Sequence, residues 1–186
     1  NVYLVNEGSD VMDVHASVKV YDASSTLLFE DSCMLASSYR NTVNAFDLNR
    51  FQGTSHFIAT EITDADGNFI ADNFYCIGAN PNVYDWEDYT WYYTPVEEFT
   101  DLSFAFSQPE ADVEMKVEEN DGLYTVTLVN NSPVISYMNI LKAKDADGEL
   151  VVPAFWSDNF FPLLPGQTKT VTCRADVKGV HMELDM

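Results

Sequence analysis

Basic residues are scarce in this chain of 186 residues, which has 9 Lys and Arg against 30 Asp and Glu and a formal net charge of −21. Phosphate backbones and anionic lipid surfaces are bound through clustered Lys and Arg, so nucleic acid and anionic membranes are excluded as partners. The acidic residues are spread along the chain, and this distribution is typical of a surface that keeps a protein soluble.

Long hydrophobic runs are also missing. No stretch reaches the roughly 18 apolar residues that a transmembrane helix needs, so we expect no membrane insertion. The chain starts at Asn1 and enters an apolar segment directly, with no initiator Met and no visible signal peptide. We therefore expect a fragment or a processed product of a longer protein.

Cysteine is rare, with 3 residues in the chain. The spacing of Cys33 and Cys76 suits the bridge of an antibody domain, but that motif places a Trp on the strand between the two, and none lies there. We therefore expect Cys33, Cys76 and Cys173 to be free, buried and unreactive thiols.

Residue patterns that support catalysis are absent as well. The sequence has no Gly-x-Ser-x-Gly elbow. Asn6-Glu7 resembles a glycosidase acid/base pair only superficially, because Glu7 adjoins Gly8 at a strand end in a chain too short for a barrel. Three widely separated histidines fall inside strand-like segments and suit structural or surface roles better than metal ligation: His15, His56 and His181. We expect no catalytic residue and no cofactor in this chain alone.

What the sequence does contain is alternation of apolar and polar residues with a period of two, which is typical of strands with one buried face. The clearest runs are 14–21, 113–118, 124–129 and 168–175. Turn sequences separate such runs, and Asp-Ala-Asp-Gly occurs twice, at 64–67 and 145–148. Many short strands with frequent turns indicate an all-β sandwich or barrel.

An internal similarity favours two copies of one sandwich over a single large sheet. Leu4-Val5-Asn6 and Leu128-Val129-Asn130 are each followed by a turn, at Asp22 and at Asp145. The segment 108–112, Gln-Pro-Glu-Ala-Asp, interrupts any regular element between the two halves. We predict two tandem immunoglobulin-like antiparallel β-sandwich domains, at 1–95 and 96–186.

The two Asp-Ala-Asp-Gly turns are also weak calcium candidates, because they supply carboxylate oxygens at alternate positions. Neither matches an EF-hand loop, since the Gly comes early and the distal Glu is missing. Asp and Gly are equally what a tight turn requires, and turn chemistry is the simpler interpretation. The candidate ligands are Asp64, Asp66, Asp145 and Asp147.

The most unusual segment is 85–95, Asp-Trp-Glu-Asp-Tyr-Thr-Trp-Tyr-Tyr-Thr-Pro, in which aromatic and acidic residues are interleaved. Sugar rings stack on exposed aromatic faces and carboxylates bind sugar hydroxyls, so a carbohydrate contact is one interpretation. The alternative is an interface between domains or with a neighbouring domain, since aromatic residues are common interface anchors. The candidate contacts here are Trp86, Trp91, Tyr92 and Tyr93.

A second aromatic run, 152–166, ends in a Pro-Gly turn. We expect Trp156, Phe160 and Leu163 to fill the core of the second domain. Trp156 is also kept among the candidate carbohydrate or interface contacts.

These two aromatic runs carry a family resemblance. Asp72-Asn73-Phe74-Tyr75, continuing through Asp85-Trp86 to Pro95, resembles the end of the fourth domain of family 2 glycoside hydrolases, in the exo-β-glucosaminidase and β-mannosidase-like branch. The run from Pro153 to Gly166 is similar to the fifth, C-terminal domain. The resemblance covers nearly the whole chain. Cys76 stands where relatives usually have Trp, and the first strand of domain 1 is expected to be missing before Asn1, which leaves an exposed sheet edge.

The resemblance implies a retaining hydrolase whose two catalytic Glu residues lie on a (β/α)8 barrel outside this sequence. The chain would then be a non-catalytic accessory module that braces the barrel, its partner in the parent chain, in a secreted or periplasmic bacterial enzyme acting on β-linked glycans. A carbohydrate-binding module is the alternative, and a cell-surface adhesion domain is a further one.

Overall fold

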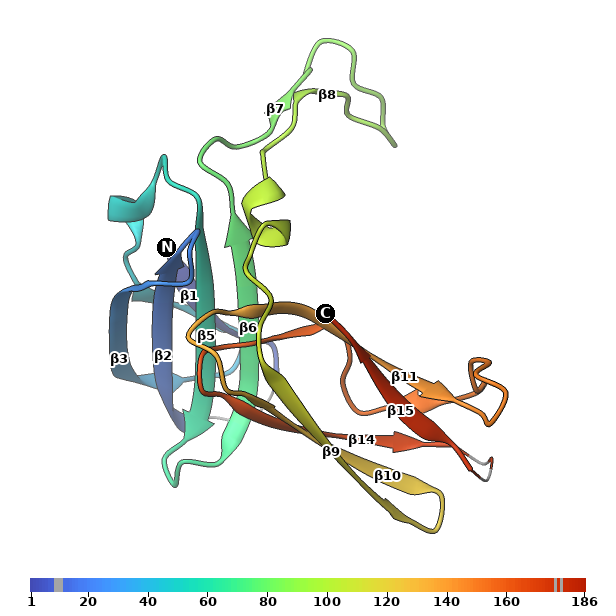
Figure 1. The fold of residues 1–186 in the computed structure, drawn as a ribbon. Helices are drawn as coiled ribbons and strands as arrows, with labels where there is room; N and C mark the ends of the chain where they lie inside the picture. Colours follow the sequence, from blue (N-terminus) through green and yellow to red (C-terminus); the bar gives the residue numbers. More distant parts are fainter. Residues whose placement is uncertain (9–11, 176, 178) are drawn as a thin grey trace. The chain divides into compact units, whose positions relative to one another are not determined.

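The computed structural model of the chain describes residues 1–8, 12–175, 177 and 179–186. Regular structure in these residues consists of β-strands and two short 3-10 helices, which confirms the predicted all-β class (Figure 1). The chain divides into two compact units, Asn1–Ala105 and Phe106–Met186. None of the described helical segments has the length and hydropathy to cross a bilayer.

The division between the units falls between residues 105 and 106, whereas the sequence suggested 95 and 96. Residues after Pro95 stay with the first unit because β8 (Val96–Glu98) pairs with β7 (Val83–Tyr84). The 3-10 helix η2 (Ser103–Phe106) then follows, and Phe104 of this helix packs on Phe57 of the first unit.

Unit 1 contains a four-stranded antiparallel sheet in the order β3-β2-β5-β6 and a two-stranded sheet of β1 and β4. The period-2 pattern directs alternate side chains of the larger sheet toward the smaller one. The strands and the remaining 3-10 helix are β1 (Val2–Asn6), β2 (Met12–Asp22), β3 (Leu27–Ser37), β4 (Asn41–Phe46), η1 (Asn49–Phe51), β5 (His56–Asp64) and β6 (Phe69–Ile77).

The core of unit 1 lies between these two sheets. Its buried members come from β2, β4, β5 and the segment after β4, and they are Ala16, Val18, Val20, Phe46, Leu48 and Ile58. Val2 of β1 and Phe51 of η1 pack against this cluster. No residue of β6 belongs to the described core, so one edge of the larger sheet has its inner face uncovered.

Three hairpins close with the same turn. The N–H groups of Ser25, Gly67 and Gly148 donate to the carbonyls of Asp22, Asp64 and Asp145 over 3.0, 3.1 and 3.1 Å. The fourth turn residue has a left-handed φ each time, at 67°, 84° and 84°. This is the type I turn with a following bulge that suits hairpins, and Gly is favoured at the left-handed position because it has no Cβ.

Unit 2 is a sandwich of two antiparallel sheets, in the orders β12-β14-β10-β9 and β13-β11-β15. Its strands are β9 (Val113–Asn120), β10 (Leu123–Asn130), β11 (Ser136–Lys144), β12 (Phe155–Trp156), β13 (Phe161–Leu163), β14 (Thr168–Arg174) and β15 (His181–Asp185).

The core of unit 2 includes Leu163, which is fully buried, and Trp156 packs against that core, as predicted. Phe160 is exposed, so its predicted place in the core is wrong. Phe160 has a φ of 59° and directs its side chain away from the core. Asn159 takes up the inward contacts, because its side chain bonds the N–H and the carbonyl of Leu141 over 2.8 and 2.9 Å.

Two fully buried asparagines connect backbone segments in the interior of unit 2 through side-chain hydrogen bonds. The Asn130 side chain donates to the carbonyls of Val134, Leu163 and Leu164 over 2.8, 3.0 and 3.2 Å, and its oxygen accepts from Ser132. Asn139 donates to the carbonyls of Ser136 and Phe161, over 3.0 Å each. Both amides thereby link backbone carbonyls of neighbouring segments inside the sandwich.

Candidate functional site

The predicted aromatic segment forms a hairpin that extends beyond the end of β6 in unit 1 (Figure 1). Val83 pairs with Glu98 and Tyr84 with Val96, and the Asp85 N–H continues the ladder to the Pro95 carbonyl over 3.0 Å. The tip closes between Thr90 and Tyr93, whose backbone groups bond each other over 2.7 and 3.3 Å. We call residues 83–98 the aromatic hairpin.

The base of the aromatic hairpin is held at two points. The Thr100 N–H donates to the Asn82 side chain over 2.7 Å, and the Thr100 hydroxyl donates to the Asn80 carbonyl. Gly78 lies beside this base, and a Cβ there would come within 2.6 Å of the Thr100 hydroxyl and 2.8 Å of the Asp101 carbonyl. Gly78 is therefore required by close approach, and the base of the hairpin is closely packed and hydrogen-bonded.

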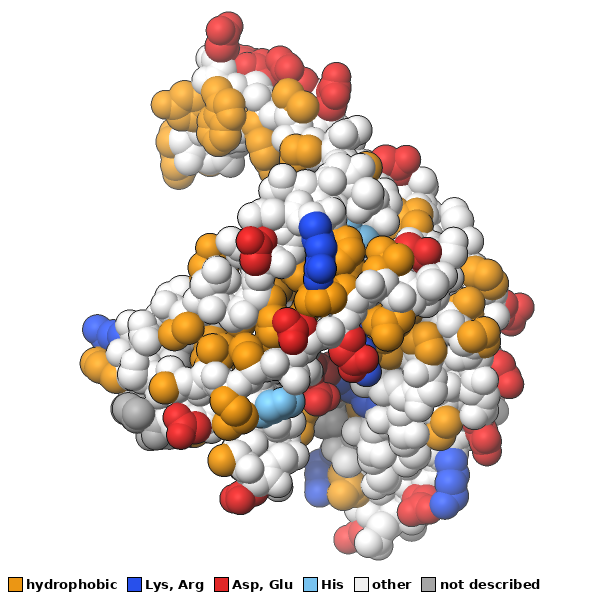
Figure 2. All heavy atoms as spheres, turned by 90° about the vertical axis from the view of Figure 1, so that its left-hand side faces the viewer, with side chains coloured by type: hydrophobic (Ala, Val, Ile, Leu, Met, Phe, Trp, Pro, Cys, Tyr) orange, Lys and Arg blue, Asp and Glu red, His pale blue; other side chains and the backbone are white. Residues whose placement is uncertain are grey.

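The rings of the aromatic hairpin are exposed. Trp91 is 92% exposed, and Trp86, Tyr89, Tyr92 and Tyr93 are also exposed. Figure 2 shows hydrophobic and acidic side chains gathered on this projection at the top of the view. The hairpin has five acidic residues and no basic one, and they are Asp85, Glu87, Asp88, Glu97 and Glu98.

The rings do not form one flat surface. Trp91 and Tyr92 meet at an interplanar angle of 79°, and Trp86 and Tyr89 at 65°. Tyr84 and Trp86 are tilted by 48°. A sugar ring stacks on a flat aromatic face, whereas edge-to-face rings present separate protruding surfaces. This geometry favours anchors that insert into another surface over a planar sugar platform.

Trp156 is placed in unit 2, on the short strand β12, where it pairs with Cys173 of β14. It is half-buried and packs on the unit 2 core. Its environment is that of a structural residue, so it differs from the exposed tryptophans of the aromatic hairpin. Its assignment as a carbohydrate or interface contact stays a prediction.

The four calcium candidates lie in the two Asp-Ala-Asp-Gly turns. The Asp64 carboxylate accepts hydrogen bonds from the N–H groups of Asp66 and Asn68 and from the Asn68 side chain, over 2.9, 2.8 and 2.8 Å. Asp145 accepts in the same way from Asp147 and Glu149, over 2.9 and 3.0 Å. Within the described residues no group of three His, Cys, Asp or Glu could hold a metal ion. The carboxylates thus serve as turn caps.

The capping of the turn at Asp64 has a pH signature. The Asn68 side chain, followed by the Asn68 backbone N–H, holds the pKa of Asp64 below its ordinary value of 3.8. A carboxyl group whose pKa is lower in the folded state stabilises the fold at pH values above its ordinary pKa. This stabilisation is lost as the pH falls through the lower pKa of the folded state. We expect Asp64→Asn to flatten the loss of stability between about pH 5 and about pH 2, as followed by urea unfolding at each pH.

The control for this prediction is Asp66→Asn, which removes an equal charge from the same turn but leaves the Asp64 carboxylate and its bonds in place. It should retain the acid-dependent loss. Equal flattening in both variants would show that net charge, rather than the cap, causes the acid dependence.

The expectation that all three thiols are buried is wrong for two of them. Cys173 is fully buried in unit 2, but Cys33 and Cys76 are only half-buried. Cys33 lies on β3 and Cys76 on β6, with β2 and β5 between them, so about 14 Å of sheet separates the two and excludes a disulfide. Burial raises the pKa of all three thiols, with Asp31 adding to the effect at Cys33.

The histidines and Glu7 do not come together as a catalytic group. His15 lies on β2 and His181 on β15, in different units, while His56 is buried at the start of β5. The His56 ring bonds the Thr54 carbonyl over 2.8 Å. Glu7 is exposed just beyond β1.

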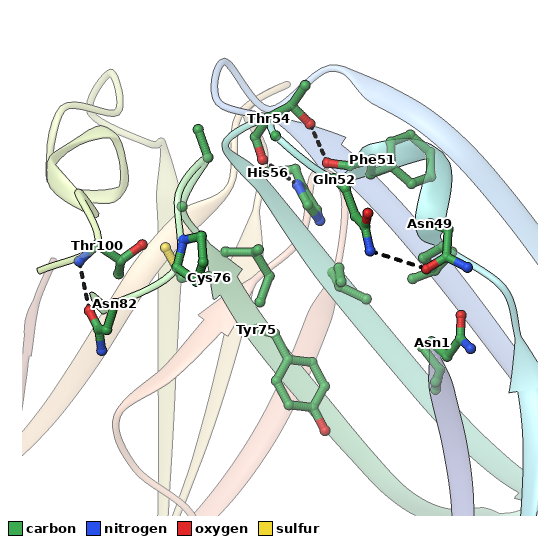
Figure 3. A pocket seen from close by; sticks show the side chains of 18 of the residues that line it. Asn1, Asn49, Phe51, Gln52, Thr54, His56, Tyr75, Cys76, Asn82 and Thr100 are labelled. Carbon is green, nitrogen blue, oxygen red and sulfur yellow. Dashed lines mark hydrogen bonds between the residues drawn. The ribbon is translucent and has the colours of Figure 1, made fainter. Parts of the chain in front are cut away.

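A groove of about 970 Å³ opens in unit 1 between β1 and β6 (Figure 3). Its apolar walls include Val2, Leu48, Ile58, Tyr75 and Ile77. Among the residues that the structure describes, no Asp, Glu, Lys or Arg lines it, although the chain has 30 acidic residues. We call it the β1–β6 groove.

The polar residues of the groove bond one another. Thr54 donates to the Phe51 carbonyl over 2.7 Å, and Gln52 donates to Asn49 over 3.3 Å (Figure 3). Asn82 accepts from the Thr100 N–H on the opposite side. The groove is therefore neutral and largely apolar, with few polar groups left to orient a polar ligand.

The model for the exo-β-D-glucosaminidase immunoglobulin-fold domain matches residues 91–185, about half of the chain. This chain belongs to that family. The match begins within the aromatic hairpin and continues through all the strands of unit 2.

Curated relatives extend the similarity to the whole chain. An exo-β-D-glucosaminidase of Arthroderma benhamiae is 30% identical over 201 residues, an alignment that covers 100% of this chain and 22% of the relative. The enzyme of the same name from Amycolatopsis orientalis is 28% identical over 194 residues, covering 96% and 19%. The chain thus spans about a fifth of the length of these relatives.

Solved structures share the fold. The exo-chitosanase of Amycolatopsis orientalis superposes with a TM-score of 0.83 at 22% identity, over 98% of this chain and 24% of that chain. A β-D-mannosidase from Dictyoglomus thermophilum gives a TM-score of 0.60 at 15% identity, over 97% and 19%. Both units therefore have counterparts within larger glycosidase chains.

Proposed function

We propose that this chain is a non-catalytic accessory module of a larger family 2 glycoside hydrolase that acts on β-linked glycans, with an exo-β-glucosaminidase as the first candidate. The support is that proteins of that name match the whole chain, while the chain spans about a fifth of their length. A retaining glycosidase needs two carboxylates about 5–5.5 Å apart across the scissile bond, and we assign both to a barrel outside residues 1–186.

The aromatic hairpin is the part of the module that we propose to dock on that barrel. Its rings are exposed, its base is held by hydrogen bonds, and the rings stand at steep angles to one another. Truncating a Trp or Tyr that acts as a buried interface anchor typically removes about 2–4 kcal/mol. The hairpin would thus brace barrel loops and fix one wall of the sugar cleft.

A carbohydrate-binding module is the second candidate, because the same rings and five carboxylates could contact an amino sugar, whose ammonium group is attracted to aromatic faces. The ring angles disfavour the flat platform that this function needs. A secreted or periplasmic bacterial location belongs to the main proposal and rests on the family resemblance. An adhesion domain would require that no barrel is encoded upstream.

The test is Tyr92→Ala and Trp91→Ala in the full parent enzyme, with a chromogenic β-glucosaminide as substrate. We expect the midpoint of thermal inactivation and kcat to fall, while KM changes less than about twofold, because the hairpin supports the cleft rather than the bound sugar. Tyr39→Ala is the matched control, since Tyr39 is an exposed tyrosine outside the hairpin.

A different outcome would favour the second candidate. If the isolated chain binds chitosan oligomers saturably in calorimetry, and Trp91→Ala removes that binding while the far-ultraviolet spectrum stays unchanged, the hairpin is a sugar site. A raised KM with unchanged thermal stability in the parent would point the same way.

A further inference from the structure

One edge of the larger sheet of unit 1 is formed by β3, on the opposite side of the sheet from β6 (Figure 1). β3 is 11 residues long, and among the described residues it pairs with β2 alone. Its other side therefore presents unpaired N–H and C=O groups, which are a template for pairing with another strand. Strands are typically about 5–6 residues long, so this free edge is a long one. We call the unpaired side of β3 the β3 edge.

The inward side chains of β3 form an apolar row with one exception. Phe29, Cys33 and Leu35 pack against the core of unit 1. Asp31 lies in the same row, because side chains alternate along a strand and Asp31 is two residues from both Phe29 and Cys33. It stands opposite Val18 of β2, which is 0% exposed. Asp31 itself is exposed, so its carboxylate faces water beside the β3 edge.

The charge of Asp31 differs from that of the neighbouring acid in having no cation beside it. Glu30, on the other face of β3, pairs with Lys19 of β2 over 3.3 Å, whereas none of the ion pairs between described residues includes Asp31. The Asp31 carboxylate instead accepts the N–H of Ser32 over 2.8 Å, so it also occupies a main-chain donor of β3. Covering this carboxylate with an apolar strand would take a charge out of water without compensation.

A second copy of the chain offers a strand that matches the β3 edge in length and in apolar pattern. In an antiparallel pair of two β3 strands centred on Ser32, Phe29 of one copy lies opposite Leu35 of the other, and Asp31 lies opposite Cys33. The shared inward row then holds two carboxylates among apolar side chains. Like charges brought together at an interface are strongly unfavourable, so Asp31 opposes this pairing twice.

We propose that Asp31 guards the β3 edge: its carboxylate prevents β3 from pairing with β3 of a second copy. Without this charge the inward row at 29, 31, 33 and 35 would be apolar throughout, and the main-chain groups of the edge would join the sheets of two copies into one. An inward-pointing charge on an edge strand is a known means of preventing such pairing. The inference is independent of the proposed function, because it concerns one edge of unit 1 alone.

The experiment is analytical ultracentrifugation of the 186-residue chain and of its Asp31→Val variant at increasing concentration. A reductant is present so that Cys33 cannot form a disulfide between copies. We expect Asp31→Val to form a dimer with a Kd at least about 100-fold below that of the unchanged chain, because two carboxylates are removed from each pair. Amide hydrogen exchange should then slow at β3 as the dimer forms, since a new ladder protects these amides.

Glu61→Val is the matched control, because Glu61 is an exposed acid on β5, which is paired on both sides, with β2 and β6. It removes the same charge and adds the same apolar side chain away from a free edge, so it should stay monomeric. Asp31→Lys should also stay monomeric, since two ammonium groups in the row oppose pairing as two carboxylates do. Where the far-ultraviolet spectrum shows that Asp31→Val does not fold, Asp31→Thr takes its place, because Thr is also β-branched and uncharged.

Three results would overturn the guard. A folded Asp31→Val or Asp31→Thr that stays monomeric would show that the carboxylate does not control the edge. Equal association of Glu61→Val would mean that any added apolar side chain on unit 1 causes it. Association of the Asp31 variant with unchanged exchange of the β3 amides would place the contact between copies on another surface.

Discussion

Asn130→Asp is expected to unfold most of unit 2 at neutral pH. The substitution keeps the shape of the side chain but replaces the amide that donates to the carbonyls of Val134, Leu163 and Leu164 with a carboxylate oxygen. Losing the donor to the buried Leu163 carbonyl costs about 1–3 kcal/mol, and the buried charge of an unpaired carboxylate adds several kcal/mol to this. The sum approaches the roughly 5–10 kcal/mol that holds a small domain together.

The pH dependence identifies the cause. A buried carboxylate facing carbonyls is expected to have a raised pKa in the folded state, so the protonated form is favoured there. Stability of the Asn130→Asp variant should therefore increase as pH falls from about 8 to about 5. Urea unfolding followed by the fluorescence of Trp156, the half-buried tryptophan of unit 2, measures this, since Trp86 and Trp91 are exposed at the start.

Asn120→Asp is the matched control, because Asn120 is an exposed asparagine of the same unit. It should change the free energy of unfolding by less than about 0.5 kcal/mol, as surface substitutions do. A similar effect of both variants, or stability that is independent of pH in Asn130→Asp, would mean that the buried amide network does not hold the sandwich.

Much of the fold follows from local patterns. The alternation in 14–21 and 124–129 predicts strands because a period of two can bury only one face of a sheet, and these segments form most of β2 and β10. The Asp-containing turns were predictable since Asp caps a turn and a left-handed fourth residue closes it. The sequence similarity between residues 4–6 and 128–130 has a structural counterpart, because the two segments form the ends of β1 and β10.

Other features depend on three-dimensional context that a linear pattern lacks. The segments Asp72-Asn73-Phe74-Tyr75 and Asp158-Asn159-Phe160-Phe161 have similar sequences, which suggests one repeated element. The first lies within β6, whereas the second mostly precedes β13, so this sequence similarity does not correspond to a shared structural element. Phe160 is exposed because the neighbouring Asn159 side chain makes the inward contacts. From residue type alone, the phenylalanine would be expected inside and the asparagine outside. The angles between the hairpin rings and the shape of the β1–β6 groove likewise depend on strand pairing and on which residues stay uncovered.

Phe57→Ala should produce the largest loss of stability in unit 1. Phe57 is 0% exposed and lies on the face of the larger sheet opposite the sandwich core, between Phe74 of β6 and Phe104 of η2, with ring centroids at 5.5 and 5.0 Å. Removing a buried phenylalanine ring costs about 3–5 kcal/mol, from lost burial and from the cavity left behind. Urea unfolding of unit 1, followed by hydrogen exchange of the β5 amides, measures the loss.

The substitution should also loosen the base of the aromatic hairpin, since η2 follows Thr100 and its Phe104 loses the ring contact with Phe57. We expect faster exchange at the Thr100 amide in Phe57→Ala. Phe57→Leu keeps most of the volume and should cost less than about 1.5 kcal/mol. Phe69→Ala removes an exposed ring from β6 and should leave both quantities unchanged. If Phe57→Ala lowered stability but left the Thr100 amide protected, the hairpin would be held by its hydrogen-bonded base alone, and η2 would have no part in presenting the exposed rings.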